Sequence, residues 1–177
     1  MFDIILILIA IVVLIVLALA SRQPDTFQVS RSISMVASPA TVFNQINDLQ
    51  NWQAWSPWAK LDPNAKNSFS GPQAGAGANM SWAGNNKVGE GSMTIVESRP
   101  HDLIRFKLDF LKPFKACNTA EFTFKSAGEN TVVVWSMSGK NNFIGKLMSL
   151  IMNCDKMVGC QFEQGLSAIK AIVEEAG

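Results

Sequence analysis

The feature that constrains this chain most is an uncharged apolar run at residues 4–20. Its seventeen residues contain no glycine and no proline, and as an α-helix they would extend over roughly 25 Å, enough to cross a bilayer. Such a run is either a retained membrane anchor or a cleaved signal peptide, for which Ala18 and Ala20 would precede the cleavage site. Because the run exceeds a usual signal-peptide core of about 7–15 residues and no Lys or Arg precedes it, a retained anchor is predicted.

Flanking charge predicts the orientation of this anchor. Asp3 is the only charged residue before the apolar run, whereas Arg22 and Arg31 follow it. Since positive residues are retained on the cytoplasmic side, we expect a single-pass membrane protein whose soluble part lies in the cytoplasm. The predicted organisation is a transmembrane helix at 1–21, a linker at 22–26 and one domain at 27–177, because the remaining length suits one core.

Composition excludes several classes of protein. The formal charge of +1 and a pI near 7.7 argue against a nucleic-acid partner, which would require a basic face. The three cysteines form no C-x-x-C pair and only one histidine is present, so we expect no disulfide framework, no metal and no cofactor. A reducing compartment fits this cysteine usage.

The residues after the linker predict strands and short helices. From 27 to 35, apolar and polar residues alternate as in a half-buried strand, with Arg31 at an apolar position. Ser38 and Pro39 provide an N-cap and a first-turn proline for a short helix, and a second helical stretch is predicted near 49–54. Beyond Pro57, turn-forming residues separate five runs that predict consecutive hairpins. Their apolar positions are Met80 and Trp82; Met93 and Ile95; Ile104, Phe106, Leu108 and Phe110; Phe122 and Phe124; and Val133, Trp135 and Met137.

A long amphipathic helix is predicted from 143 to 175, where apolar residues recur at spacings of three and four. Gly145, Gly159 and Gly165 each weaken it, so a bend or break is expected within it. The predicted fold class is α+β: a curved, mostly antiparallel sheet wrapped around a long C-terminal helix and preceded by one transmembrane helix.

The order of several motifs resembles the SRPBCC or START-like superfamily, which includes polyketide cyclase-like proteins and has a helix-grip fold. The resemblance covers about residues 27–175. The motifs are SPATVFNQINDLQNWQAWSPW at 38–58, Gly-Glu-Gly at 89–91, Lys-Pro-Phe at 112–114 and FEQGL at 162–166. What this resemblance implies is a cavity for a hydrophobic ligand between sheet and helix, and no particular reaction.

We therefore expect a membrane-anchored, non-catalytic protein that binds a lipid or another hydrophobic small molecule. Methionine and aromatic side chains suit an adaptable apolar site, and Arg31, if it points inward, would hold an acidic group of a ligand or pair with a carboxylate. An outward bulge at Arg31 is the alternative. The predicted ligand-binding residues are Trp82, Met93, Phe106, Trp135, Met137, Met157 and Arg31.

Two other functions remain open on the sequence. An accessory subunit of a membrane complex would use the domain as a docking surface for other membrane proteins. A cyclase or hydrolase acting on a hydrophobic substrate would need an acid or base such as Glu90, His101 or Asp109, although alternation places Asp109 on the polar face. The Trp52, Trp55 and Trp58 cluster is interpreted mainly as core. A further set of lysines near predicted loops is either ordinarily solvated or contacts anionic lipid headgroups: Lys112, Lys115, Lys140 and Lys146.

Overall fold

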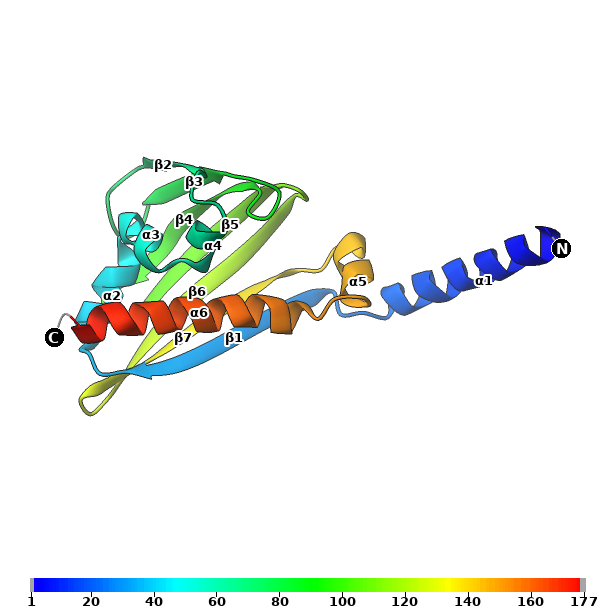
Figure 1. Ribbon diagram of the computed structural model, residues 1–177. Coiled ribbons are helices and arrows are strands. Elements are labelled where there is room, and N and C mark those ends of the chain that lie inside the picture. The colour runs from blue at the N-terminus through cyan, green and yellow to red at the C-terminus, as the bar shows by residue number, and fades with distance from the viewer. Residues whose placement is uncertain (1, 176–177) are drawn as a thin grey trace.

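The computed structural model describes residues 2–175 and confirms the predicted α+β class. One curved sheet lies against a long C-terminal helix, and an N-terminal helix extends away from both (Figure 1). The helices are α1 (Phe2–Ser21), α2 (Pro39–Asn47), the 3-10 turn η1 (Leu49–Asn51), α3 (Trp52–Trp55), α4 (Pro57–Leu61), α5 (Phe143–Ser149) and α6 (Cys154–Glu175). The strands are β1 (Thr26–Met35), β2 (Lys66–Ser70), β3 (Asn79–Ala83), β4 (Glu90–Arg99), β5 (Leu103–Lys112), β6 (Ala116–Ala127) and β7 (Asn130–Lys140).

The seven strands form one antiparallel sheet in the order β1-β7-β6-β5-β4-β3-β2. Consecutive strands pair as hairpins from β2 to β7, and β1 closes the far edge against β7. The sequence analysis missed β2, because four of its five residues are exposed and no apolar alternation marks it. The other six strands lie where their apolar alternation predicted them.

The short helices between β1 and β2 form as their start signals predict. The Ser38 hydroxyl accepts a hydrogen bond from the Thr41 N–H, and Pro39 occupies the first turn of α2. Helix α2 buries Val42, Phe43 and Ile46. The second predicted stretch continues as η1, α3 and α4, which bring the three tryptophans of this region toward the concave face of the sheet.

The predicted C-terminal helix is interrupted, although not at a glycine. It divides at residues 150–153 into α5 and α6, and the Asn153 side chain starts α6 by accepting the Lys156 N–H. Gly159 and Gly165 lie inside α6, where neighbouring side chains occupy the space that a Cβ would take. A Cβ at Gly159 would stand 2.0 Å from Arg31 Nη2, and one at Gly165 would stand 2.7 Å from Trp135 Cζ3.

Aromatic side chains pack between the sheet and α6. Trp135 of β7 stacks on Phe162 of α6 at a centroid distance of 4.1 Å and on Phe122 of β6 at 4.7 Å. Trp52 and Trp55 pack edge-on against this stack. This part of the tryptophan cluster is core, because both indoles are at least 95 % buried.

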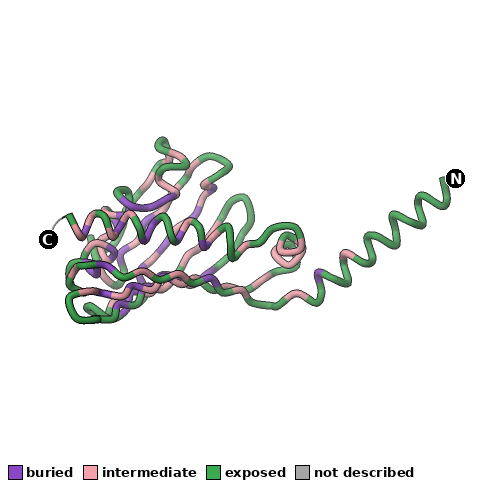
Figure 2. Tube along the Cα trace, turned by 60° about the horizontal axis from the view of Figure 1, so that its bottom comes forward, coloured by how far each residue is buried: buried purple, intermediate pink, exposed green. Residues whose placement is uncertain are grey.

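Helix α1 remains separate from this core. Its side chains are exposed along almost its whole length (Figure 2), and only Ala20 is buried. The helix is long and apolar enough to cross a membrane, and a signal sequence would have the same two properties.

Candidate functional site

An apolar cavity of about 340 Å³ lies between the concave face of the sheet, α3, α4 and α6. Its volume falls in the range of about 300–1,000 Å³ in which proteins hold small molecules. The side chains around it come from elements far apart in sequence, and most are aromatic, aliphatic or sulfur-containing. The apolar lining residues are Trp52, Trp58, Ala59, Pro63, Ala65, Met80, Trp82, Val88, Met93, Phe106, Leu108, Phe110, Pro113, Ala120, Trp135, Met137, Val158 and Phe162.

Strand register explains why one face of the sheet builds this cavity. Phe106, Ala120 and Met137 lie opposite one another on β5, β6 and β7. Successive side chains of a strand point to opposite faces, so these three share the concave face. Between Phe106 and Met137, Ala120 contributes only a methyl group. The small side chain at Ala120 therefore leaves space in the middle of the sheet.

The cavity opens at one end of the sheet. Apart from Gln53, its exposed lining residues are Pro63, Lys87, Lys112 and Pro113, which lie in the α4–β2 connection, the β3–β4 loop and at the end of β5. These are the segments around the mouth of the cavity. The apolar interior and the charged mouth together suit a ligand whose body is hydrophobic and whose polar end faces water.

Polar groups in the wall are few and differ in their availability. Asp62 holds the mouth together, because its carboxylate accepts the backbone N–H of Asn64 at 3.1 Å and that of Asn85 at 2.6 Å. Ser56 is 8 % exposed and lines the cavity. Its hydroxyl makes no capping hydrogen bond to α4. Ser56 therefore contributes a hydroxyl to a wall that is otherwise mostly apolar.

The structure places five of the seven predicted ligand-binding residues in the cavity wall. These are Trp82, Met93, Phe106, Trp135 and Met137. Their contact with a ligand stays a prediction.

Met157 and Arg31 lie outside the cavity wall, which corrects their predicted position. Met157 is 50 % exposed on α6, because it lies outside the apolar stripe in which Val158 and Phe162 recur four residues apart. Arg31 follows the regular alternation of β1, so the bulge considered above does not form. Since β1 is an edge strand, Arg31 meets α6 beside the cavity.

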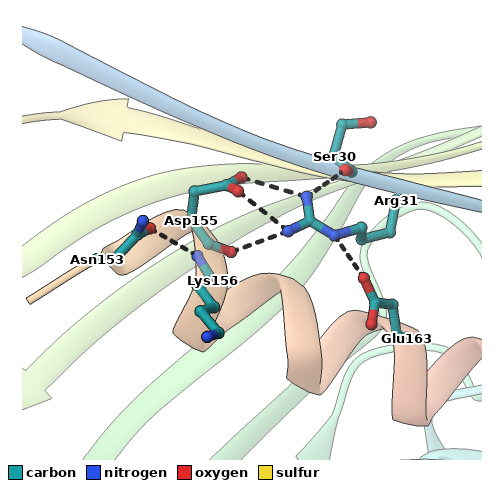
Figure 3. A network of polar contacts seen from close by, with 6 residues as sticks. All are labelled: Ser30, Arg31, Asn153, Asp155, Lys156 and Glu163. Atoms are coloured by element: carbon teal, nitrogen blue, oxygen red, sulfur yellow. Dashed lines mark hydrogen bonds and ion pairs between the residues drawn. The ribbon is translucent and has the colours of Figure 1, made fainter.

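Carboxylates of α6 hold the Arg31 guanidinium (Figure 3). Its Nε donates to Glu163 at 2.8 Å, and Nη2 donates to Asp155 Oδ2 at 3.0 Å and to the Asp155 carbonyl at 3.1 Å. The hydrogen bond from Arg31 holds the pKa of the Asp155 carboxyl below its usual value, and the two carboxylates raise the pKa of Arg31. The guanidinium lies across Gly159, so this contact joins β1 to the N-terminal half of α6.

The three candidate acids and bases also lie outside the cavity wall. Glu90 pairs with Lys112 at 2.7 Å. His101 lies in the exposed β4–β5 turn with φ 63°, edge-on to Phe43. Asp109 pairs with Lys107 at 2.8 Å, and this hydrogen bond lowers the pKa of the Asp109 carboxyl.

Sequence reasoning missed several wall residues. Val158 and Phe162 could have been assigned to the wall from the helical period alone, and Leu108 and Phe110 from the strand period. Ala120 carries no such signal, because a small side chain predicts neither a wall nor a space. Within residues 2–175, His, Cys, Asp and Glu side chains form no group of three that could hold a metal ion.

Solved structures share this architecture. A protein from Chromobacterium violaceum, CV1439, is 16 % identical, with 86 % of this chain and 99 % of that chain covered and a TM-score of 0.60. Ara h 8.0201 is 12 % identical, with 84 % and 97 % covered and a TM-score of 0.58. The di-domain ARO/CYC StfQ from the steffimycin biosynthetic pathway is 12 % identical, with 85 % and 51 % covered and a TM-score of 0.63. At these identities the likeness concerns the fold, and no curated protein matches the chain.

A curved sheet that closes around a C-terminal helix and encloses an apolar cavity defines a helix-grip protein, as the motif order predicted. The chain belongs to the family described as polyketide cyclase / dehydrase and lipid transport, whose model matches residues 26–174. The matched region begins with β1 and ends within α6, so α1 lies outside it.

Proposed function

We propose that this chain is a membrane-anchored, non-catalytic protein that binds a lipid or another hydrophobic small molecule between its sheet and α6. The observation that carries the proposal is the apolar cavity of about 340 Å³, which belongs to a domain of a family associated with lipid transport. In this proposal residues 1–21 form the membrane anchor, 22–26 the linker and 27–177 the binding domain. The flanking arginines favour a cytoplasmic domain.

The chemistry of the wall supports binding rather than catalysis. General acid or base catalysis requires a titratable group within hydrogen-bond reach of the reacting atoms. The titratable side chains in the cavity wall, as far as the described residues 2–175 extend, are Asp62, Lys87 and Lys112. All three belong to the mouth, and the Asp62 carboxylate already accepts two backbone N–H groups.

A cyclase is the second candidate, because the family description names cyclases as well as lipid transport. The substrate would enter the same cavity, and Asp62 or Lys112 would be the nearest ionisable groups. The two functions differ in what leaves the protein: a binding protein returns its ligand unchanged, whereas a cyclase returns a product with a new ring.

The test is native mass spectrometry of the detergent-solubilised full-length protein, followed by lipid extraction and identification of the bound molecule. The proposal expects a defined hydrophobic molecule that is recovered unchanged after prolonged incubation. A protein that carries no such molecule, and takes up none from added membrane lipids, would contradict the proposal.

The anchor is tested separately. The proposal expects the chain to remain in membranes during a carbonate wash and to retain its N-terminal residues by intact-mass analysis. A protein that begins near Ser21 would instead show that α1 is a cleaved signal sequence.

A further inference from the structure

The end of the sheet that adjoins α1 also carries the mouth of the cavity. In the antiparallel register, Thr26 pairs with Lys140, Phe110 with Ala116, and Glu90 with both Lys112 and Ala83. The loop at 84–89, the loop at 113–115 and α5 therefore all lie at the end where β1 follows α1 (Figure 1). From β1 to β4 this end spans four strand spacings, or roughly 20 Å. We call it the α1 end of the sheet.

Large apolar side chains are exposed at the α1 end. Phe114, at the tip of the β5–β6 loop, is 57 % exposed, and Phe143 and Ile144 in the first turn of α5 are 50 % and 48 % exposed. Ile151, after α5, is 81 % exposed. Further exposed apolar side chains at this end are Leu111, Met148 and Met152. A group of this kind marks a surface that contacts a membrane or a protein.

A set of contacts fixes this surface relative to α1. Helix α5 packs against α1, and Ala20 of α1 is fully buried. The Asn141 N–H donates to the Asp25 carbonyl at 2.7 Å, and the Asn141 side chain donates to the Pro24 carbonyl at 3.2 Å. Lys146 of α5 pairs with the Asp25 carboxylate. The linker is therefore held to the domain, and the exposed apolar residues of α5 lie beside the last turn of α1.

The two ends of the sheet differ in the side chains that they expose. Exposed lysines stand among the apolar residues of the α1 end: Lys87, Lys112, Lys115 and Lys140. Such a mixture suits the interface of a bilayer that contains anionic lipids. At the opposite end the β4–β5 and β6–β7 turns expose polar residues, namely Arg99, His101, Asp102 and Glu129.

We infer that the domain docks on the bilayer surface through α5 and the β5–β6 loop, so that the mouth of the cavity faces the lipid. The occupant of this surface is the bilayer because α1 ends beside it, and the inference rests on the proposed anchoring of α1. A hydrophobic ligand then moves between membrane and cavity without crossing bulk water.

The test places an environment-sensitive nitrobenzoxadiazole label on the full-length chain after its three cysteines are replaced by serine. Single labels at F114C and I144C report on the docking surface, and E129C in the β6–β7 turn is the matched control at the opposite end. The proteins are reconstituted in vesicles of phosphatidylcholine and phosphatidylglycerol, with and without lipids that carry a nitroxide near the headgroup.

We expect blue-shifted emission and quenching by the nitroxide lipid at positions 114 and 144, and neither at 129. If all three labels behave alike while the chain resists a carbonate wash, the anchor stands and the docking inference is overturned. Blue-shifted emission without quenching by the lipid would assign the surface to a protein and also overturn it. Loss of the chain in the wash would overturn the anchor, and the docking inference with it.

Discussion

Replacing Ala120 by phenylalanine should weaken ligand binding while the domain remains folded. Ala120 is 4 % exposed and lies between Phe106 and Met137 on the cavity face. Burial of the added phenyl ring contributes about 1.5–3 kcal/mol, and crowding of the wall costs about 1–3 kcal/mol. Because these terms nearly cancel, the unfolding midpoint should stay within about 8 °C of the wild-type value, given about 2–4 °C per kcal/mol at this size.

The effect on binding should be larger than the effect on stability. A ligand that shares the filled cavity with the new ring encounters the same crowding cost of about 1–3 kcal/mol, which corresponds to an affinity loss of about 5- to 150-fold. The assay is the fraction of full-length protein that retains its hydrophobic ligand in native mass spectrometry. Thr119→Phe is the matched control, because Thr119 precedes Ala120 in β6 and points to the opposite face.

A folded A120F protein that retains as much ligand as the wild type would refute the reasoning. The ligand would then occupy another part of the molecule. Equal loss of ligand in A120F and T119F would trace the effect to a disturbed β6 rather than to a filled cavity.

Three further predictions concern positions around the cavity. Gly159→Ala should destabilise the wild-type chain, because the new Cβ displaces the Arg31 guanidinium. In an Arg31→Met chain the same substitution should instead stabilise the fold by about 0.5–1 kcal/mol through helix propensity. Thermal unfolding of the wild type, the two single variants and the double variant will measure both effects. The pKa of the Asp155 carboxyl is lowered by its hydrogen bond with Arg31, so this pairing contributes its full stability above the ordinary Asp pKa of about 3.9 and loses it as the pH falls through the lowered pKa. Wild type and Asp155→Asn should therefore converge in stability once the pH has fallen below that lowered pKa, as acid unfolding of the two proteins will measure. Gly91→Ala should cost about 1–3 kcal/mol and move Trp82, since the new Cβ would lie 2.6 Å from Trp82 Cζ2; tryptophan fluorescence and thermal unfolding will report both effects.

Each of these predictions has an outcome that contradicts it. If Gly159→Ala changes the stability equally with and without Arg31, the position of the guanidinium does not depend on the missing side chain at Gly159. A stability difference between wild type and Asp155→Asn that persists in strong acid would mean that the carboxylate charge is not responsible. Unchanged fluorescence in Gly91→Ala would show that Trp82 is not held by that contact.

Local sequence patterns predicted most of the secondary structure of this protein, and the order of its motifs predicted the fold class. The uncharged run before residue 21 forms helix α1, as its length and its lack of glycine and proline predicted. Alternation at period two predicted six of the seven strands, and the Ser38-Pro39 signal predicted the start of α2. The order of motifs was sufficient for the fold class and the family. These properties depend on neighbouring residues or on the order of motifs along the chain. They can therefore be predicted without knowing the distances between residues that are far apart in the sequence.

Tertiary structure decided which side chains share a site. The sequence placed Arg31 on an apolar face, but only the packing of α6 on the edge strand β1 gave it Asp155 and Glu163 as partners. The break that separates α5 from α6 at 150–153 falls at no glycine, so the sequence pattern did not locate it. The space beside Ala120 exists because three strands and one helix meet around a methyl group. A cavity belongs to no local segment, so its size and its mouth follow only from how distant segments pack.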